Sequence, residues 1–209
     1  MIMIHRETIT QKMSEIATVV YARLDSLYYL AGGTALALLF GHRESVDLDY
    51  FISSHIDTQK LKDILLLLFP QILFTYEEID TLWCSVDGVK ISFISRFSPL
   101  IDTVEEVGEF RLVGARDLVV MKLNAICGRD EYKDYYDLAE LTIRTDGREW
   151  PILWEKVYPS SDVIAWIVAL SHVGNVTEVP LKGKNIREKK EVENMLFSLV
   201  KEMSSFVEK

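Results

Sequence analysis

One stretch of the sequence, "YYLAGGTALALLFGHRESVDLDYFI" at residues 28–52, constrains the fold more than any other. A short apolar run ends at a pair of glycines, which favours a buried strand followed by a tight turn. A helical segment follows, with Thr34 as its expected N-cap and Gly41 as its end. "VDLDYFI" then alternates with a period of two, which predicts a second strand with Asp47 and Asp49 on one face.

The rest of the chain predicts an α+β fold, in which a mixed sheet with flanking helices precedes a C-terminal helical lobe. Apolar residues at helical spacing predict a helix over residues 6–26, and "TQKLKDILLLLF" predicts another that Pro70 ends. "QILFTYEEI", "TLWCSV" and "VKISFISRF" are typical of strands, and the Asp-Gly between the last two is typical of a hairpin turn. From residue 115 the pattern is helical. We therefore expect residues 1–114 to form the core and residues 115–209 a lobe packed on it.

The composition is that of an ordinary globular protein, with 209 residues, 49% of them hydrophobic and 26% charged. The two cysteines form no CxxC or Cys/His cluster, which favours a reducing compartment and argues against structural zinc. "MIMIHRETITQK" lacks the apolar core of a signal peptide. "ILLLLFPQILF" is far shorter than the roughly 20 residues of a membrane span. We therefore expect a cytoplasmic protein with no membrane partner.

The net charge of −9 gives no global attraction to nucleic acid or to an anionic membrane. One local basic segment, "KGKNIREKKE" at residues 182–191, has two interpretations. It is either a patch for a polynucleotide or, as such runs more often are, a solvated loop and helix start. The second interpretation is favoured. The lobe's Trp150, Trp154 and Trp166 are expected in its core rather than at an interface.

Asp47 and Asp49 give the sheet a pair of like charges that a divalent cation would stabilise. Hard carboxylate oxygens suit Mg²⁺ (or Mn²⁺), which takes one or two carboxylates together with substrate phosphates. The pair taken alone is as well explained by a strand end in water. The Gly-Gly-Thr turn before a helix start favours an anion, although alone it is only a tight turn. One helix apart, the two features together predict a site for a metal-bound nucleoside triphosphate (NTP).

These residues resemble the signature of the nucleotidyltransferase-like AbiEii/AbiGii toxin family, within the polymerase-β-like nucleotidyltransferase fold. The first block carries the family pattern at Gly32, Gly33, Thr34, Leu36, His42, Arg43, Ser45, Asp47, Asp49 and Phe51. The second block, "MKLNAICGRDEYKDYYDL", is similar to the family's later motifs at Lys122, Arg129, Lys133, Asp134 and Asp137. Together the blocks cover residues 28–52 and 115–141.

The resemblance implies a role for each matched position. The implied nucleotide-binding residues are Gly32, Gly33, Thr34, Arg43, Ser45 and Lys122. The implied catalytic residues are Asp47, Asp49, Lys122 and Asp134, of which Asp47 and Asp49 are the metal ligands. Arg43 would pair either with a phosphate or with the aspartates. The alternatives are a helix lysine reaching water for Lys122 and a surface charge pair for Asp134.

The sequence departs from the fold's usual pattern at the third carboxylate, which many of these enzymes carry on a later strand. The expected equivalent strand, "GVKISFISR", offers Ser92 and Ser95 instead. Asp87 and Asp102 are close in sequence but at strand ends. Since serine is no base at neutral pH without help, either Asp134 supplies the base or substrate is positioned without one.

The resemblance implies an enzyme that moves a nucleoside monophosphate (NMP) from an NTP to an acceptor. The acceptor would be an RNA, such as a tRNA end, or a protein hydroxyl. Such a protein would be the toxin of a toxin–antitoxin or abortive-infection pair, with an antitoxin encoded nearby. The alternative is a non-catalytic module of the same fold that binds a nucleotide or a partner, which the missing third acid favours.

Overall fold

The computed structural model describes the backbone of residues 3–207 and the side chains of residues 3–203. The chain divides into two compact units. The first comprises Met1–Pro99 and Thr103–Val113, and the second comprises Leu100–Asp102 and Gly114–Lys209. The outer limits expected for the two domains, residues 1 and 209, lie outside the described residues.

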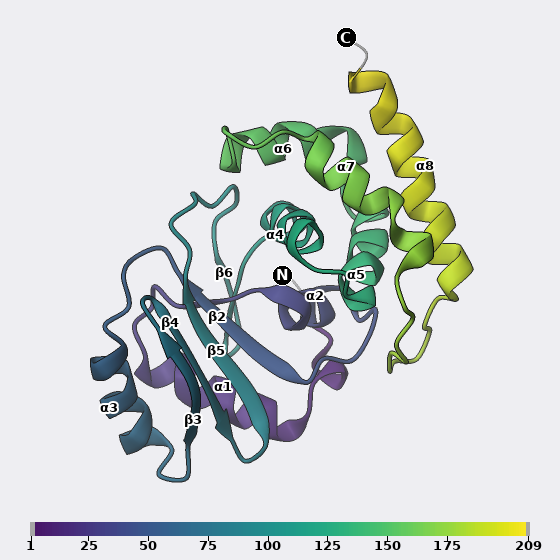
Figure 1. Ribbon diagram of the computed structural model, residues 1–209. Coiled ribbons are helices and arrows are strands. Elements are labelled where there is room, and N and C mark those ends of the chain that lie inside the picture. The colour runs from purple at the N-terminus through teal and green to yellow at the C-terminus, as the bar shows by residue number, and fades with distance from the viewer. Residues whose placement is uncertain (1–2, 208–209) are drawn as a thin grey trace. The chain divides into compact units, whose positions relative to one another are not determined.

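The first unit is built on a mixed sheet, seven-stranded within the described residues, in the order β3-β4-β5-β2-β1-β7-β6 (Figure 1). Its strands are β1 (Tyr29–Leu30), β2 (Asp47–Ile52), β3 (Leu73–Glu78), β4 (Thr81–Val86), β5 (Val89–Ser95), β6 (Glu105–Val107) and β7 (Phe110–Leu112). β2 pairs antiparallel with β1 and parallel with β5. The predicted α+β class, with a mixed sheet and flanking helices, is confirmed.

Four helical segments flank the sheet: η1 (Arg6–Thr8), α1 (Gln11–Arg23), α2 (Gly32–Phe40) and α3 (Thr58–Leu68). The helix expected over residues 6–26 is shorter, because the Thr10 side chain accepts a hydrogen bond from the Met13 N–H and starts α1 there. α1 contacts β2 and β7. On one face of the sheet the ring of Tyr50 stacks on that of Phe93 at 5.4 Å, and both are buried. This apolar face holds the core of the unit.

The predicted cap of α2 is wrong. The helix begins at Gly32 with Ala31 as N-cap, while Thr34 lies inside the helix and is fully buried. The predicted end is correct, since Gly41 adopts φ 66° and donates to the carbonyl of Ala37 at 2.8 Å.

The hairpin between β4 and β5 turns at Asp87 and Gly88, with φ of 50° and 83°. Two successive residues with positive φ are what a tight two-residue hairpin needs, and Asp-Gly supplies them at low cost. The predicted turn is confirmed. It fixes the register of β5 against β4, and β5 in turn carries Ser92 alongside β2.

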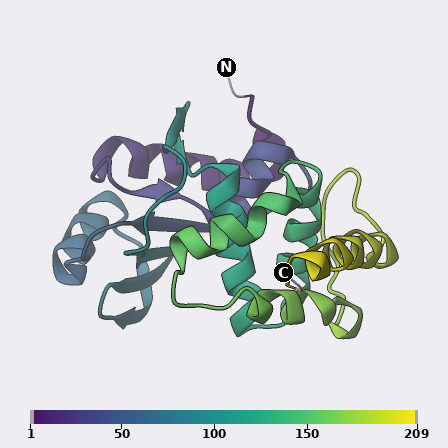
Figure 2. The ribbon, with the colours of Figure 1, turned by 90° about the horizontal axis from the view of Figure 1, so that it is seen from above.

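The second unit is helical: α4 (Ala115–Gly128), α5 (Tyr132–Thr142), η2 (Gly147–Glu149), α6 (Trp150–Val157), α7 (Ile164–Ser171), η3 (Val173–Asn175) and α8 (Lys189–Val207). Both views show α8 running beside α5 and α7 (Figures 1 and 2). Trp150, Trp154 and Trp166 are at most 3% exposed, so they form core as expected. Over the described residues, the helices are too short or too polar to span a membrane.

Candidate active site

Asp47 and Asp49 lie on the same face of β2, which we call the open face. Both are half-buried, whereas Leu48, Tyr50 and Ile52 between and after them point into the core. The predicted alternation is therefore confirmed. The neighbouring strand β5 brings Lys90 opposite Asp47 and Ser92 opposite Asp49.

Ser92 is one of the two serines, with Ser95, on the strand where the sequence analysis expected a third carboxylate, and it lies opposite Asp49. Its hydroxyl donates to Asp49 Oδ1 at 2.6 Å, so the residue fixes the orientation of that carboxylate. The two other acids considered lie elsewhere. Asp87 is in the hairpin turn and pairs with Lys12 at 3.2 Å, and Asp102 belongs to the second unit, where it pairs with Arg116.

Gly32 lets the Asp49 carboxylate approach the start of α2. Its φ is +65°, a conformation that side-chain-bearing residues rarely adopt. A Cβ at this position would also meet Asp49 Oδ2 at 3.0 Å. The glycine is thus required by the backbone turn, and the turn sets the beginning of the helix against the aspartate.

Gly33 accommodates the guanidinium of Arg43. A Cβ on Gly33 would lie 2.3 Å from Arg43 Nη2, so the arginine fills the space a side chain would take. Arg43 is only 5% exposed, and its Nη1 donates to the carbonyl of Glu44 at 3.0 Å. The positive charge is held against the first turn of α2, where the sequence predicted a phosphate.

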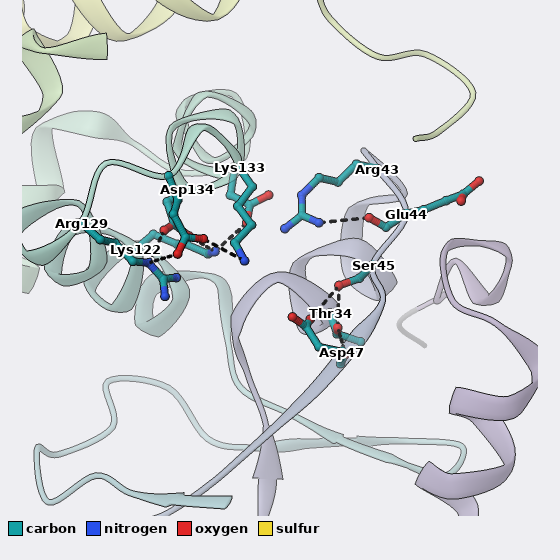
Figure 3. Close-up of polar contacts among 11 residues, drawn as sticks. Thr34, Arg43, Glu44, Ser45, Asp47, Lys122, Arg129, Lys133 and Asp134 are labelled. Atoms are coloured by element: carbon teal, nitrogen blue, oxygen red, sulfur yellow. Dashed lines mark hydrogen bonds and ion pairs between the residues drawn. The ribbon is translucent and has the colours of Figure 1, made fainter. Parts of the chain in front are cut away.

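Thr34 and Ser45 connect α2 to the beginning of β2 (Figure 3). The Thr34 hydroxyl donates to the backbone carbonyl of Asp47 and lies 2.7 Å from Ser45 Oγ. Ser45 Oγ is 3.4 Å from Asp47 Oδ1, and both hydroxyl residues are buried. Their side chains therefore position Asp47.

The second unit holds a buried charge cluster between α4 and α5 (Figure 3). Lys122 Nζ lies 2.6 Å from Asp134 Oδ1 and 2.7 Å from Asp137 Oδ2, and Arg129 Nε lies 2.8 Å from Asp134 Oδ2. Asp134 and Asp137 have no exposed surface, and the Lys122 side chain is 6% exposed. A lysine reaching water and a surface charge pair are therefore both excluded for these positions.

Burial raises the pKa of Asp134, but the Lys122 ammonium and the Arg129 guanidinium more than offset this effect. Its pKa is therefore held below the ordinary value, and the carboxylate stays ionised inside the unit. Asp137 is three residues further on α5, on the same helix face, and is the second ligand of the ammonium. The sequence comparison contained Asp137 in its second block without assigning it this role.

The basic segment at residues 182–191 is an exposed loop followed by the start of α8. Arg187 lies 3.6 Å from Glu140 and also pairs with Glu191. Lys189 donates to the carbonyl of Val176 at 2.8 Å. These contacts agree with the favoured structural interpretation of the segment.

Asp47 and Asp49 are suited to a hard divalent cation. Across the part of the chain that the structure describes, no group of three or more His, Cys, Asp or Glu residues could hold a metal ion. Mg²⁺ needs only one or two protein carboxylates when substrate phosphates complete its shell. The donor set of the open face therefore fits Mg²⁺ or Mn²⁺ bound together with a nucleotide.

Comparison with known proteins identifies the family. Residues 17–147 match the family described as "Nucleotidyl transferase AbiEii toxin, Type IV TA system", a range that contains both motif blocks. The chain is also 36% identical over 125 residues to the uncharacterized protein aq_aa25 of Aquifex aeolicus (strain VF5). That alignment covers 53% of this chain and 55% of the relative, so the match spans about half the relative's length.

Two crystal structures share the fold along nearly the whole chain. One is a candidate nucleotidyltransferase from H. pylori, 15% identical, with a TM-score of 0.60 over 94% of this chain and 98% of the other. The second is JHP933 from Helicobacter pylori, also 15% identical, with a TM-score of 0.56 over 96% and 97%. At this identity the likeness concerns the fold alone. The family match over residues 17–147, which is more than half of the chain, establishes that the chain belongs to the AbiEii nucleotidyltransferase toxin family.

Proposed function

We propose that this chain is a metal-dependent nucleotidyltransferase that moves an NMP from an NTP to an acceptor hydroxyl. The observation that carries the proposal is the pair Asp47 and Asp49, which face the same way beside the start of α2. Family membership supports the transferase class. In the reaction the acceptor oxygen bonds to the α-phosphorus, the bond to the β,γ-pyrophosphate breaks, and the hydroxyl proton leaves to solvent.

Each residue of the first unit has a distinct role in the proposal. Asp47 and Asp49 would hold Mg²⁺ or Mn²⁺, and the ion would supply charge neutralisation for the phosphates and activation of the acceptor oxygen. Ser92 keeps Asp49 in one orientation through its hydrogen bond. The backbone N–H groups at Gly32 and Gly33 face the triphosphate at the helix start.

Arg43, Thr34 and Ser45 complete the proposed nucleotide site. The Arg43 guanidinium, already held against Gly33, adds a fixed positive charge for a phosphate oxygen. Thr34 and Ser45 keep Asp47 in place from within the unit, rather than through their own contact with phosphate.

Lys122 and Asp134 retain their proposed catalytic roles with one condition. Lys122 Nζ is already within 2.7 Å of two carboxylates, so a triphosphate oxygen would have to compete with these two ion pairs for the ammonium. Asp134 would act as a base only after losing its present ion pairs, since its lowered pKa makes it a weak proton acceptor.

The family description supports the proposal that the protein is the toxin of a type IV toxin–antitoxin pair. The acceptor would be an RNA, a tRNA among the candidates, or a protein, and an antitoxin would be encoded nearby. Expression without the antitoxin should arrest growth, and Asp47→Asn should relieve the arrest. If the Asp47→Asn protein is equally toxic at equal abundance, toxicity does not come from the proposed chemistry.

The test combines calorimetry with transfer from labelled NTP, using total RNA and cell protein as acceptors. We expect Mg²⁺-dependent NTP binding and transfer, both lost in Asp47→Asn and in Asp49→Asn. Both variants should stay folded, because each removes like-charge repulsion. The control is Asp63→Asn, an exposed acid on α3 whose partner is Gln59. Binding without transfer to any acceptor would favour the non-catalytic module, and transfer by the double variant would refute the site.

A further inference from the structure

The open face of the sheet continues beyond the two aspartates onto β4 and β3. Paired residues run across four strands in one row: Asp49 on β2 is opposite Ser92, Ser92 is opposite Trp83, and Trp83 is opposite Tyr76. Directly opposed residues on neighbouring strands point to the same side of a sheet. The row therefore joins the proposed metal ligand to two aromatic rings, all within the first unit. The four strands that carry it, β2, β5, β4 and β3, are consecutive in the sheet (Figure 1).

The two rings form a half-exposed aromatic platform, defined here as Trp83 and Tyr76. Trp83 is 47% exposed and Tyr76 43%, and their centroids are 4.9 Å apart. β4 is an inner strand, and its other face is buried through Leu82 and Cys84. The Tyr76 hydroxyl donates to Glu78, which restrains that ring. Large aromatic side chains so exposed on a polar sheet face are typical of a binding surface.

Charge on the open face is arranged asymmetrically around the platform. Lys90 on β5 is exposed and lies opposite Asp47 on β2 and Ser85 on β4. It therefore belongs to the row next to that of Trp83, one strand closer to the aspartates. Glu78 lies next to Tyr76 at the outer edge. A ligand with a planar apolar part over Trp83 and an anionic part toward Lys90 would match this order.

We propose that the platform binds the unpaired 3′ end of a single-stranded RNA acceptor, a step that rests on the transferase function proposed above. A base stacks on Trp83 and Tyr76, and Lys90 contacts a backbone phosphate. Trp83 lies two strands from Asp49, a spacing of ~10 Å. This is the span of a nucleoside, so the terminal ribose hydroxyl reaches the carboxylate pair while its base is held.

An RNA explains the platform better than a protein acceptor does. Every base has a flat π-face, so stacking holds any terminal nucleotide without reading its sequence. The local lysine also supplies cationic contact in a chain whose net charge is −9. A protein substrate would need neither a paired aromatic surface nor a phosphate contact.

Trp83 provides its own fluorescent reporter. The chain has four tryptophans, and the other three, Trp150, Trp154 and Trp166, are at most 3% exposed in the second unit. We would titrate the protein with an unlabelled adenylate RNA hexamer carrying a 3′-hydroxyl, without NTP or Mg²⁺. A fluorescein-labelled copy of the same hexamer would be used for anisotropy. Base stacking should quench the emission. Trp83→Phe should lose the quenching but retain affinity, measured by anisotropy of the labelled hexamer, since phenylalanine still stacks.

Removal of the ring should weaken RNA binding selectively. We expect Trp83→Ala to raise the Kd for the hexamer by about tenfold or more and to leave the Kd for NTP unchanged. Lys90→Ala should reduce the slope of log Kd against log salt concentration by about the amount that one phosphate contact contributes. The control is Leu67→Ala, which removes an 84% exposed apolar side chain from α3. Circular dichroism would verify that every variant is folded.

The outcomes separate this inference from the proposed function. The platform would be overturned if Trp83→Ala and the wild type bound RNA with equal affinity. It would also be overturned if NTP quenched the Trp83 emission and the Kd for NTP changed in Trp83→Ala, because the rings would then bind the nucleotide. Transfer of the NMP to protein acceptors alone, with no quenching of Trp83 emission by RNA, would also overturn the platform but would leave the transferase function intact. RNA-dependent quenching in a protein that transfers to no acceptor would support RNA binding by the platform, but would refute the enzyme and the role of that RNA as its acceptor.

Discussion

Lys122→Ala should be among the most destabilising substitutions in the chain. The ammonium is the partner of two carboxylates without exposed surface, at 2.6 Å from Asp134 and 2.7 Å from Asp137. Arg129 continues to pair with Asp134 when Lys122 is removed. Removal of one partner from a buried ion pair costs about 3–5 kcal/mol. For a domain stable by roughly 5–15 kcal/mol, this is a large share of the free energy of unfolding.

Urea unfolding at pH 7, followed by circular dichroism, would measure the loss. Lys133→Ala is the matched control, because Lys133 is 38% exposed and pairs with Glu131 at 2.9 Å on the surface. That pair is worth less than about 1 kcal/mol. In Lys122→Met with Asp137→Asn, the buried negative charge is removed with its partner, so the double variant should regain about half of the loss or more.

A loss below about 1 kcal/mol for Lys122→Ala would refute the reasoning, because a buried carboxylate would then tolerate the absence of its cation. The result also bears on activity measurements. A Lys122 variant that transfers no NMP demonstrates a triphosphate contact only if its fraction of folded protein is known.

Three further predictions concern the first unit. Gly33→Ala should change the free energy of unfolding by less than about 1 kcal/mol, because only the Arg43 guanidinium must move to make room for the new Cβ. The same substitution should lower kcat about tenfold or more, because it displaces the charge that serves the reaction. An unchanged kcat would show that Arg43 is not part of the site. Gly32→Ala should cost about 1–3 kcal/mol in thermal unfolding, because its φ is +65°; wild-type stability would contradict this. Hydrogen bonding to Arg6 lowers the pKa of Glu109 from 4.5 to about 2. Glu109→Gln should therefore lower the free energy of unfolding at pH 7 by about 1 kcal/mol, a small value because the Arg6 side chain is half exposed to solvent. The difference from the wild type should vanish as the pH falls from 4.5 through 2, where Glu109 becomes protonated. An equal loss at both ends of a pH series of urea midpoints would exclude the ion pair as its cause.

Much of the fold follows from local patterns in the sequence. The period of two in "VDLDYFI" is sufficient to put Asp47 and Asp49 on one face, and Asp-Gly is sufficient to predict the β4–β5 turn. The cap of α2 was not predictable in the same way. A threonine after two glycines resembles an N-cap, but the positive φ of Gly32 starts the helix three residues earlier, with Ala31 as N-cap.

The contacts that define the candidate site depend on long-range register. Ser92 meets Asp49 only because β5 lies parallel to β2 in one register, 43 residues away in sequence. Likewise, the alternation of β4 indicates that Trp83 faces away from the core, but not that it shares a row with the aspartates. The sequence therefore predicts which residues matter, while their partners require the folded chain.

The central claim, transfer of an NMP, is tested most directly by the position of the label that an acceptor receives. The wild-type protein would be incubated with Mg²⁺, total RNA and cell protein, and with each NTP labelled either at the α- or at the γ-phosphate. We predict that α-label enters the acceptor, that γ-label leaves as pyrophosphate, and that both events disappear in Asp47→Asn. Acceptor labelled from the γ-phosphate, or α-label incorporated equally by Asp47→Asn, would contradict the account.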